Sequence, residues 1–281
     1  MGFLTSVLRA PARLFSGNKP TVVVVSLYGA ISAEARPSRG LSANGVEQGL
    51  KRAFGDKSVK AVVLAINSPG GAPTQARMIM DRVRHLAQKS ELPVISYIED
   101  VGASGGYLIA LAGEEIWADP FAIVGSIGVV AAGFGFHEAI GKLGIDRRVH
   151  HAGDNKVRLD PFQPEKKEDA ERLERLLDES HGLFIDLVKE GRGERISGED
   201  RDVFSGDFYL AGEGKKLGLI DEVGDLRTLL KQRYGDDVKI RTMSGRREGL
   251  FGALGASVTA GLVDALVFRL RDEGLRQRLG R

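Results

Sequence analysis

Cysteine is absent from this 281-residue chain, and so is any long hydrophobic run. Without cysteine the chain has no disulfide, no thiolate zinc site and no cysteine nucleophile. The longest uncharged run, residues 120–136, is interrupted by four glycines and a proline, whereas a membrane span needs about 20 predominantly apolar residues. Arg9 and Pro11 also interrupt the apolar stretch that a secretion signal requires. We therefore expect neither a transmembrane span nor a signal peptide.

The net charge is only +2, which excludes a generally basic nucleic-acid-binding protein. Positive charge gathers at the two ends: residues 1–20 carry three cations and no acid, and residues 245–281 carry seven arginines against four acids. Apolar residues at near-helical spacing predict amphipathic arms over residues 1–19 and 245–281, which would lie on anionic lipid or pack on protein. We expect a central domain over residues 20–244, a cytoplasmic location, and attachment to the inner face of the membrane.

Short β-branched runs alternate with helical patterns along the central part of the chain. Strands are predicted over residues 22–27, 61–66, 93–98 and 115–118, and helices over residues 42–54, 73–89 and 165–190. Continuous apolar runs are typical of strands buried on both faces, and their alternation with helices predicts an α/β fold with a mostly parallel sheet. Residues 203–210, a helical stretch from residue 213, and residues 238–241 suggest a smaller α+β closing region.

The sequence GASGG at residues 102–106 follows a predicted strand and precedes a short apolar helix. A strand, a sharp glycine turn and a helix present the hydroxyl of Ser104 well, because the helix N-terminus offers unpaired N–H groups to a developing oxyanion. The pattern also matches the nucleophile elbow of α/β-hydrolases. Taken alone it is weak, since small residues at such turns often only allow close packing.

A second glycine turn, NSPGG at residues 67–71, ends the preceding strand. Neighbouring parallel strands end side by side, so this turn is expected to lie against Ser104. The N–H of Gly71 would then pair with the N–H of Gly105 in a two-donor oxyanion hole. An extended substrate would run along residues 67–73 and 127–134, where Gly70 and Gly128 leave room for it.

The five histidines are poor candidates for the base that activates Ser104. His85 falls on the charged face of its helix, and His181 falls inside the long helix. His150 and His151 are expected on a strand, where adjacent side chains point to opposite faces; this disfavours both a shared site and a metal. The chain also continues for 100 residues after its last histidine, unlike an α/β-hydrolase.

Lysine is the alternative base. Its ordinary pKa near 10.4 must fall by about 2–3 units through desolvation before the amine can act at neutral pH. Ser126, in the sequence GSIG at residues 125–128, is placed to orient such an amine. Composition does not single out one lysine; the candidate is Lys156, in the segment GDNK at residues 153–156.

Four blocks in order, NSPGG at 67–71, ASGGY at 103–107, GSIGV at 125–129 and GDNK at 153–156, resemble the signal peptide peptidase A family of Ser/Lys serine proteases. The resemblance covers about residues 20–235. It implies that Ser104 is the nucleophile, that Lys156 is the general base held by Ser126, and that Gly71 and Gly105 form the oxyanion hole.

The resemblance further implies the Clp protease/crotonase fold of stacked ββα units, over residues 20–244. It implies a serine endopeptidase without metal or cofactor that cleaves apolar, signal-peptide-like substrates. Members form homo-oligomers in which neighbouring subunits complete the site. Many carry an N-terminal membrane anchor, for which this sequence has no pattern.

Two rival functions remain open at this stage. A crotonase-type acyl-CoA enzyme would use the same paired N–H groups with a carboxylate such as Glu99 or Asp100, and would not need Ser104. A non-catalytic scaffold would use the terminal arms to organise lipid-bound oligomers.

Overall fold

A computed structural model describes residues 19–35 and 40–244 of the chain. Both proposed terminal arms therefore lie almost wholly outside the described residues. The strands are β1 (Thr21–Tyr28), β2 (Val59–Ser68), β3 (Val94–Ala103), β4 (Glu115–Ala118), β5 (Ile123–Gly125), β6 (Phe208–Leu210), β7 (Glu222–Val223) and β8 (Lys239–Ser244). The helices are α1 (Ala43–Gly55), α2 (Pro73–Ser90), α3 (Gly105–Ala110), α4 (His137–Lys142), α5 (Lys167–Arg192), α6 (Asp200–Val203), α7 (Ala211–Lys216) and α8 (Leu226–Tyr234).

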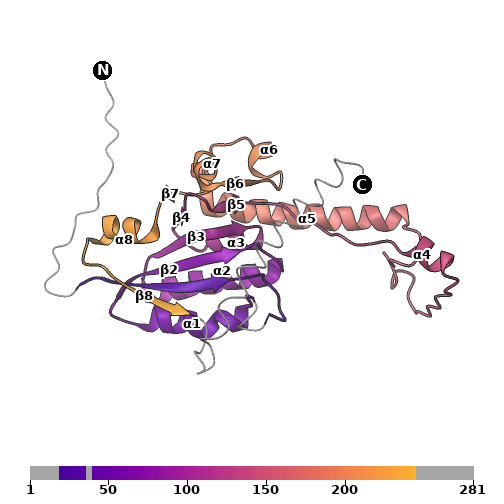
Figure 1. Cartoon of the computed structure of the whole chain (residues 1–281), viewed down its shortest axis with the longest axis horizontal. Coiled ribbons are helices and arrows are strands. Elements are labelled where there is room, and N and C mark those ends of the chain that lie inside the picture. Colours follow the sequence, from indigo (N-terminus) through magenta and orange to yellow (C-terminus); the bar gives the residue numbers. More distant parts are fainter. Residues whose placement is uncertain (1–18, 36–39, 245–281) are drawn as a thin grey trace, which may run out of the picture. The chain divides into compact units, whose positions relative to one another are not determined.

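The strands form one mixed sheet in the order β6-β5-β3-β2-β1-β8 (Figure 1). β4 also pairs with β3, and β7 pairs with β4. All of these pairs are parallel except β5 with β6. The α/β class with a mostly parallel sheet, expected from the sequence, is confirmed. The strand expected over residues 238–241 is part of β8, which extends the same sheet beside β1.

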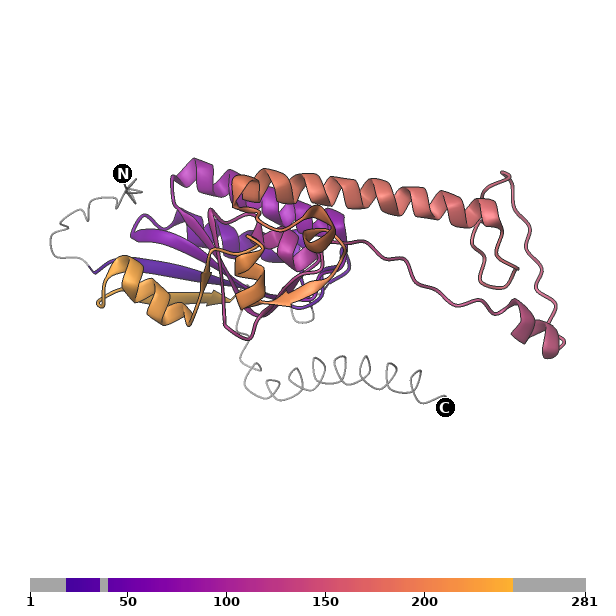
Figure 2. The same cartoon turned by 90° about the horizontal axis from the view of Figure 1, so that it is seen from above.

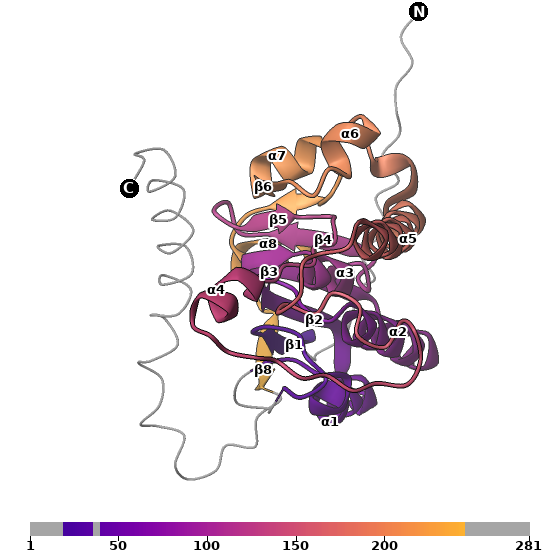
Figure 3. The same ribbon diagram turned by 90° about the vertical axis from the view of Figure 1, so that its right-hand side faces the viewer.

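Helices cover the sheet on both faces. Val23 of β1 belongs to the larger apolar core under α1, α2, α3 and α5, while Val22 and Val24 belong to the smaller core under α8. Figure 2 shows α5 and α8 on opposite sides of the strands, and Figure 3 shows α2 and α5 on the same side. Burial on both faces explains why β1 reads as an unbroken valine run.

The carboxyl-terminal half of β3 extends beyond the predicted strand and is what positions the site. β3 pairs with β4 through residues 95–98 and with β5 through residues 101–103. On its other side the register with β2 shifts between Ile66 and Ser68, so that Ser68 lies opposite Gly102. The turns that follow β2, β3 and β5 consequently meet at one edge of the sheet.

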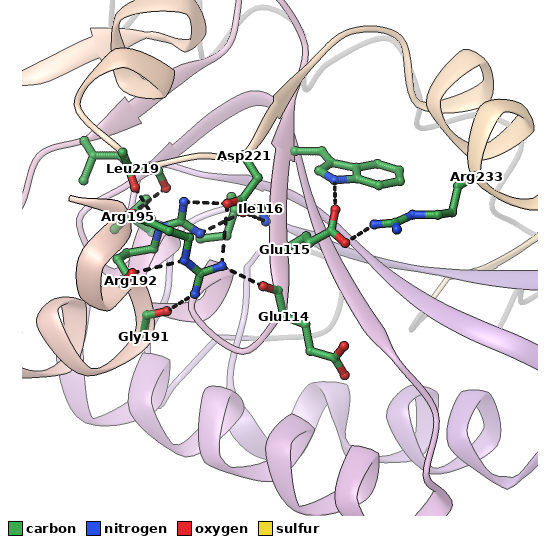
Figure 4. Close-up of polar contacts among 12 residues, drawn as sticks. Glu114, Glu115, Ile116, Gly191, Arg192, Arg195, Leu219, Asp221 and Arg233 are labelled. Carbon is green, nitrogen blue, oxygen red and sulfur yellow. Dashed lines mark hydrogen bonds and ion pairs between the residues drawn. The ribbon is translucent and has the colours of Figure 1, made fainter. Parts of the chain in front are cut away.

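A buried ion pair anchors the last turn of α5 to the body (Figure 4). The Arg192 side chain is 2% exposed and binds Asp221 through two hydrogen bonds of 2.8 and 2.9 Å. Arg192 Nε also donates to the carbonyl of Gly218, and Asp221 accepts the N–H of Ile116 in β4. The carboxyl-terminal end of α5 is thus fixed to the sheet by a geometrically complete pair.

The anchor predicts a strong effect of Asp221→Asn on stability. The variant leaves a buried guanidinium without its counter-charge, so we expect the free energy of unfolding at pH 7 to fall by about 3–5 kcal/mol. Asp200→Asn is the matched control, because its ion pair with Lys189 of α5 is exposed and is worth at most about 1 kcal/mol. Denaturant unfolding of both variants measures the difference, and equal losses would contradict the anchoring role.

The same pair predicts acid sensitivity. Burial alone would raise the pKa of Asp221, but hydrogen bonds from Arg192 and Ile116 outweigh it and lower the pKa below its ordinary value of 3.8. Because the folded-state pKa is the lower one, this stabilisation is fully present above pH 3.8 and is lost as pH falls through the folded-state pKa. We expect the Asp221→Asn variant to lose less stability than the wild type over that acid range in unfolding titrations.

Candidate active site

Ser104 occupies a strained backbone position at the junction of β3 and α3. Its φ is +52° and its ψ is −123°, a conformation that costs a non-glycine residue about 1–3 kcal/mol and is found mainly at functional sites. Two hydrogen bonds hold it: its N–H donates to the carbonyl of Gly125 at 2.9 Å, and its carbonyl accepts the N–H of Leu108 at 3.0 Å. The side chain is half-buried at the edge where three turns meet.

The glycine turn after β2 lies directly against this junction, as expected from the sequence. A Cβ on Gly70 would lie 2.8 Å from both the Gly105 nitrogen and the Ser104 Cβ. Gly70 and Gly71 have φ values of +102° and +136°, and the Gly70 carbonyl accepts the N–H of Ile31 at 2.8 Å. Only glycine permits this backbone conformation and this approach together.

The N–H groups of Gly71 and Gly105 lie close together and are free. A Cβ on Gly105 would lie 3.4 Å from the Gly71 nitrogen. Neither N–H has an acceptor within residues 19–35 and 40–244, and Gly105 opens α3, where helix N–H groups are unpaired. Two free donors beside a serine can stabilise the negative charge that develops on a carbonyl oxygen when the serine hydroxyl attacks the carbonyl carbon.

Ser126 follows β5 in a second strained position. Its φ is +51°; its N–H donates to the carbonyl of Asp207 at 2.7 Å, and its carbonyl accepts the N–H of Gly128 at 3.0 Å. The bond from Ser104 to Gly125 places the Ser126 turn next to the Ser104 junction. A Cβ on Gly128 would lie 3.0 Å from the Cα of Gly206, so this turn also rests backbone against backbone.

Lys156 is not brought to Ser104 within the chain. It is exposed and lies in a turn, with its N–H bonded to the carbonyl of Gly153. Figures 1 and 2 show α4, in the segment between β5 and α5, beyond the amino-terminal end of α5 and away from β3 and α3. Asn155 and Arg158, on either side of Lys156 in that segment, lie against the amino-terminal half of α5. Apolar side chains of this segment are open to solvent, with Val130 85%, Phe134 80% and Leu143 73% exposed.

The histidines take different positions from one another. His85 is exposed on α2, as expected. The expectation that His150 and His151 lie on a strand is wrong: both are exposed in an irregular part of the segment before α5, where no neighbouring strand pairs with them. His181 is half-buried on α5, and its Nε2 lies 2.9 Å from the carbonyl oxygen of Ile127.

A polar cluster lies at the ends of β1 and β2. The sequence had pointed to its carboxylates, Glu99 and Asp100, but not to their partners. Tyr28 donates to Glu99 at 2.9 Å, and Asn67 donates to Asp100. Burial, followed by the bond to Glu99, raises the pKa of Tyr28 to about 12. Burial also raises the pKa of Glu99, against the Tyr28 bond that lowers it. The contact between Tyr28 and Glu99 could have been predicted from the alternation of side chains along β1 and β3, since residues 28 and 99 fall on the same sheet face.

Neither a metal site nor a membrane-spanning element is found among the described residues. No three His, Asp or Glu side chains of residues 19–35 and 40–244 are grouped as metal ligands. In that part of the chain, every helix is too short or too polar to cross a bilayer.

A family model described as peptidase family S49 matches residues 86–239, which is more than half of the chain. A protein of Brucella abortus, named Na(+)/H(+) antiporter NhaA, is 50% identical over 85% of this chain and 32% of its own length. A putative protease of Methanocaldococcus jannaschii is 36% identical over 63% of this chain and 56% of its own length. A putative signal peptide peptidase SppA of Enterococcus faecium is 27% identical over 62% and 50%.

This chain therefore spans between a third and just over half of these relatives, and their names belong to the whole proteins. Two solved structures of the 1510-N membrane-bound stomatin-specific protease share the fold. A serine-to-alanine variant has a TM-score of 0.53 at 18% identity, covering 80% of this chain and 98% of that one. A lysine-to-alanine variant in complex with a substrate peptide has a TM-score of 0.51 at 18% identity, covering 80% and 92%.

The contact between the two glycine turns makes Gly70→Ala informative. The added methyl meets backbone at 2.8 Å in a left-handed conformation, so we expect a loss of about 1–3 kcal/mol in stability. Because the turns must separate, Ser104 should also lose reactivity toward a fluorophosphonate. Gly212→Ala is the control, since Gly212 lies on α7 with open space around it, and alanine favours a helix by about 0.5–1 kcal/mol. Full reactivity of a folded Gly70→Ala variant would contradict the geometry.

Proposed function

This chain belongs to peptidase family S49, and we propose that it is a serine endopeptidase that hydrolyses peptide bonds through an acyl-enzyme on Ser104. The observation that carries the proposal is the strained Ser104 at a strand–helix junction, with the free N–H groups of Gly71 and Gly105 beside it. Strain of this kind is stored where a side chain must be presented to a reactant.

The proposed reaction begins when the neutral amine of Lys156 takes the proton of the Ser104 hydroxyl. The Ser104 Oγ bonds to the peptide carbonyl carbon, and the N–H groups of Gly71 and Gly105 stabilise the resulting oxyanion. As the C–N bond breaks, the lysine gives its proton to the leaving amine. A water molecule then gives a proton to the neutral Lys156 amine and attacks the ester carbon. As the C–O bond breaks, the lysine returns that proton to the Ser104 Oγ and the acyl group leaves as the acid.

We propose that Lys156 reaches Ser104 from a neighbouring copy of the chain. Support comes from the segment between β5 and α5, which leads Lys156 away from its own Ser104 and exposes apolar side chains. Apolar surface of this extent is typical of a protein interface. In such an assembly the neighbouring copy would also supply the desolvation that a lysine base requires.

The proposed substrates are extended peptides with small or apolar side chains, of the kind found in signal peptides. A structural neighbour is described as holding a substrate peptide, and one relative is named as a putative signal peptide peptidase. In this chain Gly70 and Gly128 lie in the two turns that flank the Ser104 junction, and the proposed path of an extended peptide follows these turns.

Labelling with a fluorophosphonate tests the nucleophile. We expect the wild type to be labelled at Ser104 and to cleave apolar peptides, with Ser104→Ala losing label and lowering cleavage by a factor on the order of 10³. Ser90→Ala is the control, because the hydroxyl of Ser90 caps its own helix away from the site. An unlabelled wild type that acts on acyl-CoA thioesters would support the crotonase-type alternative instead.

Mixing two inactive variants tests the source of the lysine. If Lys156 acts on a neighbour's Ser104, co-assembled Ser104→Ala and Lys156→Ala chains regain about a quarter of wild-type activity, since random pairing forms that share of intact sites. As the control, Ser104→Ala mixed with the Ser104→Ala/Lys156→Ala double variant stays inactive. A first mixture that also stays inactive, although both chains co-assemble, contradicts an intermolecular site.

A further inference from the structure

His181 makes a contact with the active-site edge that the proposed mechanism does not use. Its Nε2 lies 2.9 Å from the carbonyl oxygen of Ile127, the residue that follows the strained Ser126. A carbonyl oxygen only accepts, so Nε2 carries the proton and donates. Ile127 is fully buried, and a buried carbonyl without a partner would carry a desolvation penalty.

The turn that contains Ile127 needs outside support. Ser126 has a positive φ, and a non-glycine residue keeps such a conformation only where its surroundings over-determine it. The N–H of Ser126 is held by Asp207, and the N–H of Gly128 closes back onto the Ser126 carbonyl. The bond from His181 is the side-chain hydrogen bond that holds this turn from α5.

His181 also lies where the segment carrying Lys156 is joined to the body. That segment leaves the sheet just after Ile127 and returns through α5. Before His181, the polar contacts of α5 among the described residues stay within the helix or go to the segment, as in the ion pair of Arg158 with Asp169. After His181, Phe184 and Val188 pack into the core. The contact of His181 with Ile127 therefore joins the two points at which the segment connects to the body of the protein.

We propose that His181 is a positioning residue: by donating from Nε2 to the Ile127 carbonyl, it holds the Ser126 turn and aligns α5 with it. The proposal rests on the proposed function, in which Ser126 orients the lysine amine. His181 takes no part in proton transfer. Both the neutral ring with its proton on Nε2 and the imidazolium donate this bond, so holding the carbonyl does not depend on the ring's charge.

Two substitutions, His181→Gln and His181→Met, separate the loss of the hydrogen-bond donor from the loss of the side chain. Glutamine places an N–H₂ group at the same number of bonds from Cα as the Nε2 of histidine, whereas methionine has similar length and no donor. In a peptide-cleavage assay we expect His181→Met to lower kcat about tenfold or more while KM changes by less than about twofold. His181→Gln should restore most of kcat and keep the wild-type pH–rate profile. His85→Gln, on an exposed histidine of α2, controls for loss of any histidine.

Three results would overturn the proposal. His181→Gln as inactive as His181→Met, with a limb of the pH profile removed, would make His181 a proton-transfer group. His181→Met with wild-type kcat would make the contact dispensable. If both variants lose the same amount of kcat and the same amount of thermal stability, the role of His181 would be one of general folding.

Amide hydrogen exchange provides a readout that does not depend on peptidase activity. The N–H of Ser126 is bonded to the carbonyl of Asp207 and the N–H of Gly128 to the carbonyl of Ser126, so His181→Met should speed their exchange by about tenfold or more while His181→Gln does not. Unchanged exchange in His181→Met contradicts the positioning role. If exchange responds as expected but the wild type shows no Ser104-dependent cleavage, the proposed function fails and the positioning of the turn by His181 stands.

Discussion

The close approach of two backbone turns is the constraint on which the rest of the structure depends. A Cβ on Gly106 would lie 2.3 Å from the carbonyl oxygen of Ser68, so the end of β2 and the start of α3 are in contact without side chains between them. The register shift between Ile66 and Ser68 sets this approach. Beside Ser104, the N–H groups of Gly71 and Gly105 have no acceptor in the part of the chain that the structure describes.

Two strained serines are held by one continuous set of hydrogen bonds. The N–H of Ser104 binds the carbonyl of Gly125. The next residue, Ser126, is held by the carbonyl of Asp207, just before β6, and through Ile127 by His181. Farther along α5, the buried pair of Arg192 and Asp221 fixes the end of the same helix to β4. The strain at the site is thus balanced by contacts from the sheet on one side and from α5 on the other.

The geometry of the site supports neither of the two alternative functions. Glu99 and Asp100, the carboxylates that a crotonase-type reaction would need, are engaged by Tyr28 and Asn67 at the ends of β1 and β2. The free N–H groups instead lie beside a serine. The scaffold alternative depends on terminal arms that lie outside the described residues, so the fold does not support it. A scaffold also gives no reason for the strained backbone at Ser104, because an unstrained residue would serve there equally well.

Local sequence alone determined the first four strands, the main helices and the two glycine turns, because β-branched runs, helical spacing and the φ values that only glycine adopts easily are properties of neighbouring residues. It did not predict the short strands β5 and β7. Parallel strand order then placed the turn at residues 67–71 against Ser104. The strained φ of Ser126, the contact of His181 with Ile127 and the pairing of Tyr28 with Glu99 required the tertiary structure, because each joins residues more than 50 positions apart or depends on a turn held from outside. The position of Lys156 was likewise decided by the path of the segment between β5 and α5, whose apolar side chains Val130, Phe134 and Leu143 stay largely exposed.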